Sequence, residues 1–79
     1  MPDDLWTGVE MKDIRVGDVL RVRKDAYTGK AAEAHNGRLV KVIDRKDGDV
    51  VVHTIDMKLP YMTGTRHAPY RLERKVAQL

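Results

Sequence analysis

Six basic side chains and one tyrosine between residues 21 and 41 are the groups in this chain best suited to binding a polyanion. They are Arg21, Arg23, Lys24, Tyr27, Lys30, Arg38 and Lys41. Cationic groups contact phosphates, and an aromatic ring among them offers a face on which an unpaired base can stack. This combination indicates a nucleic-acid partner, with RNA favoured over DNA. The acids Asp25, Glu33 and Asp44 occur in the same region, and such mixed charge equally suits a protein partner.

A second group of side chains, within residues 57–62, has the composition of a protein-binding surface. It contains Met57, Leu59, Pro60, Tyr61 and Met62. Exposed methionine and tyrosine side chains are enriched at protein interfaces. The same side chains could instead cover the open end of a small barrel, and the sequence leaves these two alternatives open.

The residue types that catalysis and metal binding require are sparse. The chain contains no cysteine and no serine, which removes disulfides, thiolate zinc ligands and the two commonest nucleophiles. His35, His53 and His67 are eighteen and fourteen residues apart, so they form no compact metal-binding motif. Most of the acids lie at predicted turns, where carboxylates bond to the backbone. We therefore expect a non-enzymatic protein with no catalytic residues, no metal and no cofactor.

Alternating side chains predict that a β-strand positions the first arginines. Residues 19–23 follow a Gly-Asp turn signal and alternate between apolar and basic positions. In a strand, successive side chains point to opposite faces. Leu20 and Val22 are therefore expected to face the core, and Arg21 and Arg23 to face solvent.

A β-hairpin is predicted between residues 38 and 56. The segments 38–44 and 49–56 are rich in β-branched residues and are separated by a turn that contains Asp47-Gly48. Asp-Gly readily takes the positive φ angles that a two-residue hairpin turn needs. The long connection before this hairpin contains residues 30–36, which could form one or two helical turns, although so short a helix is seldom stable alone.

The last third of the chain contains one segment of ambiguous secondary structure and one predicted strand. Residues 57–69 contain two prolines and a glycine, so they could form either a long loop or a short strand at 61–63 between two turns. Residues 70–76 then alternate, which predicts a closing strand with Tyr70, Leu72, Arg74 and Val76 facing the core. At the other end of the chain, Asp3 or Asp4 could cap one short helical turn.

Length and composition indicate one small globular domain. The chain has 79 residues, of which 42% are apolar and 34% charged, with a net charge of +3 and a pI of 9.4. Its first residues lack the basic flank and apolar run of a signal peptide, and no segment reaches the ~20 apolar residues of a membrane span. We expect a cytoplasmic protein without a membrane partner. An acidic segment, residues 1–12, would precede one mainly all-β domain, residues 13–77, because several short strands favour a small barrel.

Residues 14–56 resemble the KOW motif and its SH3-like barrel, as found in a ribosomal protein of the large subunit and in NusG-type transcription factors. The matching residues occur in the family's order, as Gly17, Asp18, Val22, Gly29, Lys30, Gly37, Val40 and Val50 to Val52. The resemblance implies a five-stranded SH3-like barrel. It also implies binding to RNA, or to a ribonucleoprotein or transcription complex, through the first long loop. The alternative is a protein-protein adaptor or inhibitor that uses residues 57–62 or an exposed edge strand. In either case we expect a monomer or a weak edge-strand dimer.

Overall fold

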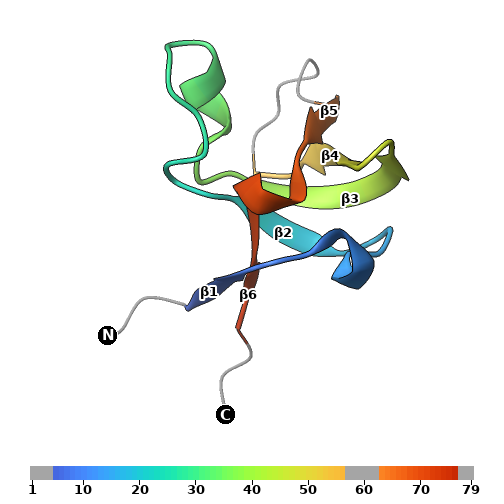
Figure 1. The fold of residues 1–79 in the computed structure, drawn as a ribbon. Helices are drawn as coiled ribbons and strands as arrows, with labels where there is room; N and C mark the ends of the chain where they lie inside the picture. The colour runs from blue at the N-terminus through green and yellow to red at the C-terminus, as the bar shows by residue number, and fades with distance from the viewer. Residues whose placement is uncertain (1–4, 57–62, 77–79) are drawn as a thin grey trace.

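The fold consists of six short antiparallel strands in one curved sheet, seen in a computed structural model that describes residues 5–56 and 63–76 (Figure 1). The strands are β1 (Trp6–Gly8), β2 (Val19–Val22), β3 (Leu39–Lys46), β4 (Asp49–Thr54), β5 (Thr63–His67) and β6 (Leu72–Lys75). Single 3-10 turns are η1 (Met11–Asp13), η2 (Ala32–His35) and η4 (Pro69–Arg71). The predicted mainly β fold is confirmed, with six strands in place of the five expected.

Strand order explains how so short a chain encloses a core. The sheet runs β1-β6-β2-β3-β4-β5, so the strands from β2 to β5 follow each other and β6 returns to pair with β2. Within the described residues, the two edge strands β1 and β5 are not paired with each other. The sheet therefore curls around the core without being closed by a hydrogen-bonded ladder.

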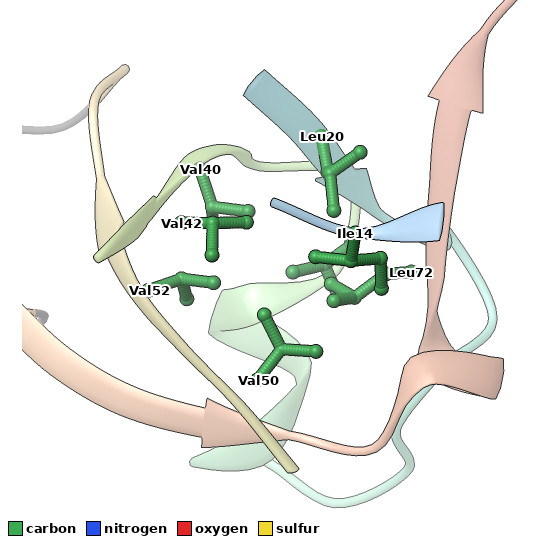
Figure 2. Packing of buried hydrophobic residues seen from close by; sticks show 8 residues of the cluster. Ile14, Leu20, Val40, Val42, Val50, Val52 and Leu72 are labelled. Atoms are coloured by element: carbon green, nitrogen blue, oxygen red, sulfur yellow. The ribbon is translucent and has the colours of Figure 1, made fainter. Parts of the chain in front are cut away.

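The buried hydrophobic core consists of branched aliphatic side chains from four strands and of Ile14, which directly follows η1 (Figure 2). Its fully buried members are Ile14, Leu20, Val22, Val40, Val42, Val50, Val52 and Leu72. On β2, β3 and β4 they occupy every second position, as the period of a strand requires. The predicted inward orientation of Leu20 and Val22 is confirmed.

The predicted hairpin is present as β3 and β4. Asp47 and Gly48 connect the two strands with φ angles of 51° and 81°. Positive φ at both central residues is the geometry that matches the twist of a two-residue hairpin. The hairpin thus follows from local sequence chemistry.

The region after the hairpin differs from both predicted alternatives. Residues 57–62 lie outside the described residues. The strand that follows is β5, residues 63–67, so the predicted loop through residue 69 was wrong. Of the predicted strand at 61–63, residue 63 is in β5 and residues 61 and 62 lie outside the described residues. A turn was predicted at Gly64, because glycine usually interrupts a strand.

Gly64 instead forms a bulge inside β5. Val52 on β4 is opposite Thr65 and His53 is opposite Thr63, so Gly64 is an extra residue between two paired positions. Its φ of 75° is one that glycine adopts readily and that a bulge of this kind requires. The bulge adds local twist to an edge strand, which discourages pairing with another chain.

The predicted closing strand at 70–76 is shorter and differently oriented. Pro69 begins the turn η4, and its fixed φ suits the first position of a helical turn. Tyr70 therefore lies in this turn and is 68% exposed, and Val76 lies beyond β6 and is also exposed. Leu72 does face the core, whereas Glu73, expected to point to solvent, is buried.

The first described residues form a strand where a helical turn was predicted. β1 pairs with β6, with Trp6 opposite Lys75 and Gly8 opposite Glu73. Pairing with an exposed strand edge satisfies the backbone groups of this segment better than one isolated turn would. The only helical turn near this end among the described residues is η1, which lies after the strand.

Candidate functional site

The long loop between β2 and β3, residues 23–38, is fixed at its base by a reciprocal pair of hydrogen bonds. The N–H of Tyr27 donates to Oδ1 of Asn36 at 3.0 Å, and Nδ2 of Asn36 donates to the Tyr27 carbonyl at 2.9 Å. The N–H of Gly37 also donates to the Val22 carbonyl at 2.9 Å. These bonds hold the two ends of the loop together, and the loop projects from the sheet as a separate arm (Figure 1).

Three aromatic rings from distant parts of the sequence meet beside this loop. Tyr27 lies at its base, His35 in η2 and His67 at the end of β5. The ring centroids of Tyr27 and His67 are 5.5 Å apart, those of His35 and His67 5.4 Å, and those of Tyr27 and His35 6.1 Å. Tilted and edge-to-face arrangements at these distances are favourable for aromatic groups. Tyr27 also packs against the aliphatic core.

A hydrogen bond joins the two most enclosed rings. The Tyr27 hydroxyl and Nδ1 of His67 are 2.5 Å apart, and His67 is only 3% exposed. Burial, reinforced by the nearby His35 and Arg71, lowers the pKa of His67 from 6.5 to about 4. His67 is therefore neutral at pH 7, so one of its ring nitrogens carries a hydrogen and the other is an acceptor. Nε2 faces Oγ1 of Thr65 at 3.4 Å.

Arg71 in η4 connects the cluster of aromatic rings to the last part of the chain through its contacts with Tyr27 and Tyr70. Its guanidinium lies 4.4 Å from the Tyr27 ring centroid and 5.0 Å from that of Tyr70. It also donates to the Ala26 carbonyl. A cation above the face of a ring is attracted by the ring quadrupole. Burial raises the pKa of Tyr27 above its usual value, so the hydroxyl stays protonated and keeps its bond to His67.

An open groove runs between η2 and β5, with these rings as one wall. Its volume is about 430 Å³, and it is lined by Tyr27, Ala31, Ala32, His35, Thr65, Arg66 and His67. The two alanines leave space beside the rings, because they carry only methyl groups. A groove with apolar and aromatic walls and a few polar groups is suited to holding a flat ring.

Some of the predicted nucleic-acid-binding residues do lie around this groove. Tyr27 forms part of its wall, and Lys30 is exposed next to the lining residue Ala31. Lys24 is exposed near the base of the loop. Arg38 is half-buried, and its Nε lies 3.4 Å from the Ala34 carbonyl.

The predicted exposure of Arg21 and Arg23 was wrong, because β1 and β6 cover them. Arg21 forms an ion pair with Glu73 and lies 4.1 Å from the ring centroid of Trp6. Arg23 is half-buried, and its Nε is enclosed without a hydrogen-bond partner among the described residues. A Cβ at Gly8 of β1 would come within 3.2 Å of Arg23 Nη2. Arg21 in particular is committed to the fold and is unavailable to a ligand.

Lys41 is exposed but belongs to a different surface. It lies on β3 opposite Val19 and His53, on the outer face of the sheet. Tyr27, by contrast, packs against the core cluster that the inner face encloses. Of the seven predicted residues, only Tyr27 is among those that line the groove; Lys30 precedes the lining residue Ala31 in the sequence, and Lys41 lies apart. The alternative site, Met57, Leu59, Tyr61 and Met62, lies outside the described residues.

Sequence reasoning missed His35 and His67 as site residues. They are 32 positions apart and form no compact motif in the sequence. Their proximity depends on the path of the long loop across the end of β5, which no local spacing encodes. Within residues 5–56 and 63–76, no group of three or more histidine and acidic side chains is placed to hold a metal ion.

No family model, curated protein or solved structure matches this chain. The described residues contain no helix of the length and apolarity that crossing a membrane demands. The groove and the side chains around it are therefore the basis for a proposed function.

Proposed function

We propose that this protein is a non-enzymatic module that binds single-stranded RNA at the groove between η2 and β5. The observation that supports this most strongly is an open aromatic groove with cationic side chains beside it. Arg66 lines the groove, Lys30 adjoins it, and the Arg71 guanidinium lies over the Tyr27 ring. Basic groups that follow a backbone, combined with rings that stack on bases, are the usual basis of single-strand binding.

The basic side chains differ in how free they are to contact phosphates. Lys24 and Lys30 are exposed on the loop, and no ion pair is found for either within the described residues. Arg66, in contrast, already contacts Asp49 at 3.4 Å and the Lys46 carbonyl at 3.2 Å. We therefore assign the main phosphate contacts to the two lysines.

We also propose that the domain is an SH3-like barrel of the kind found in KOW proteins. This is supported by the strand order, in which β2 to β5 are consecutive neighbours and β6 returns to β2. The long first loop carries Gly29 and Lys30 in the order expected from that family. In this proposal, β1 is an additional edge strand.

The test is an NMR titration of labelled protein with a mixed pool of single-stranded RNA at low and then moderate salt. We expect shifts at Lys24, Tyr27, Lys30 and His35 that are reversed by salt, because released counterions drive phosphate binding. Unchanged signals across these residues would contradict the proposal.

A pair of lysine variants makes this test quantitative. Lys30→Ala should reduce the slope of log K against log salt by about 0.7, the value of one phosphate contact to a single strand. Lys12→Ala is the matched control, since Lys12 is an exposed lysine in η1, a turn that lies well apart from the long loop (Figure 1). An equal change in both variants would mean that net charge, and not this loop, determines binding.

Protein binding is a second candidate, supported by apolar side chains on the outer surface of the sheet. Val19 on β2 and Ile43 on β3 are 50% and 43% exposed, and Val16, in the turn before β2, is 64% exposed. Exposed aliphatic groups of this size suit a protein interface more than a polyanion. If RNA causes no shifts, partner capture from lysate with wild type and a Val19→Lys variant would test this candidate.

A further inference from the structure

We propose that the groove holds one unpaired nucleobase stacked on the His35 ring, with the Tyr27–His67 pair as its rigid support. This inference rests on the proposed RNA binding and specifies how the base is held. It assigns a ligand-binding role to His35, a residue that the sequence pattern did not identify.

His35 is the ring in the cluster that is free to accept a ligand. Tyr27 is engaged by Arg71 and by its hydroxyl bond, and His67 is 3% exposed. His35 is half-buried and lines the groove. It belongs to a short turn outside the aliphatic core, so its ring can be covered by a ligand without displacing core side chains.

The rings behind His35 are held in a fixed arrangement. His67 is joined to Tyr27 at one ring nitrogen and faces Thr65 at the other, at 2.5 Å and 3.4 Å. Tyr27 is in turn fixed by the backbone bonds that it shares with Asn36. A preformed platform lowers the conformational entropy that a ligand must offset on binding.

The size and lining of the groove also fit a nucleobase. A volume of about 430 Å³ lies within the ~300–1,000 Å³ range of small-ligand pockets. Ala31 and Ala32 keep the space beside the rings open and apolar, which suits the faces of a flat base. Thr65 also lines the groove, and its hydroxyl group can form a hydrogen bond with a polar edge of the base.

Base stacking and phosphate contacts can be separated by the choice of ligand. We would measure the affinity of wild type and of His35→Ala, His35→Phe and His53→Ala for an oligouridine and for an abasic ribose-phosphate strand of equal length. His53 is an exposed histidine on β4 and provides the matched control. The NMR spectrum of each variant would verify that the fold is retained.

If the inference is right, His35→Ala weakens binding of the oligouridine about 5- to 140-fold, the value of one stacked base. His35→Phe should keep most of the affinity, His53→Ala all of it, and every variant should bind the abasic strand like wild type. Equal binding of oligouridine by wild type and His35→Ala would overturn the inference while leaving RNA binding intact. Failure of wild type to bind either strand would overturn both proposals.

Discussion

Replacing His67 with asparagine should remove a large part of the acid sensitivity of folding. His67 is buried and neutral in the folded protein, with its pKa lowered from 6.5 to about 4. The groups that face it are Tyr27, His35, Arg71 and, on β4, Asp49; His35 and Arg71 lower its pKa and Asp49 raises it. Burial is the largest of these effects.

The sign and size of the effect follow from proton linkage. Between about pH 6.5 and pH 4 the unfolded state binds a proton at His67 that the folded state does not, so acid stabilises the unfolded state. The contribution of neutral His67 to the free energy of unfolding is complete above pH 6.5 and is lost as the pH falls towards 4. Over the interval from pH 7 to pH 4.5, this shift corresponds to about 2 kcal/mol in the free energy of unfolding.

Urea denaturation followed by the fluorescence of Trp6, the single tryptophan, measures this quantity at both pH values. Asn can accept the Tyr27 hydrogen bond but does not titrate, so His67→Asn should lose about 2 kcal/mol less than wild type on acidification. His53→Asn, at an exposed position on β4, is the comparison variant for loss of a histidine outside the cluster. An equal loss in wild type and His67→Asn would refute the assignment of a neutral buried His67.

Two further predictions concern positions that the sequence pattern misjudged. Glu73→Gln should lower the free energy of unfolding by about 2 kcal/mol in urea denaturation, because it leaves the half-buried Arg21 without its ion-pair partner. The exposed pair of Glu10 and Lys12 provides the control, and Glu10→Gln should change stability by less than about 0.5 kcal/mol; similar losses in the two variants would contradict the buried role of Glu73. Gly64→Ala should cost about 1 kcal/mol in thermal or urea unfolding, since alanine is strained at a φ of 75°. Gly64→Asn should cost less, because asparagine tolerates this conformation, and a neutral Gly64→Ala would show that the bulge is absent.

Local sequence patterns predicted the inner strands well. The alternation around Leu20 and Val22 and the Asp47-Gly48 turn both depend on neighbouring residues, because strand period and turn conformation are set within a few positions of the chain. Leu20, Val22 and Leu72 of the aliphatic core followed from such alternation. The predictions were wrong where tertiary strand pairing overrode local preference. Gly64, for example, forms a bulge within β5 and not a turn.

The candidate site was predictable only in part. Tyr27 and Lys30 stood out because an aromatic residue among basic ones is visible in the sequence itself. The burial of Arg21 could not be predicted from the sequence, because the residues that contact it, Trp6 and Glu73, lie near the two ends of the chain. An alternating pattern predicts that a side chain points away from the core but does not predict which other residues pack against that side chain.

The sequence by itself determined a small, mainly β domain with an aliphatic core, a tight hairpin and a long basic loop. These features depend on composition and on contacts between near neighbours. Only the tertiary structure decided that the base of the loop meets the end of β5, where Tyr27 reaches His67 across forty residues. That contact arises because the curved sheet brings distant segments to one end of the core. Residues that are isolated in the sequence thereby line one groove.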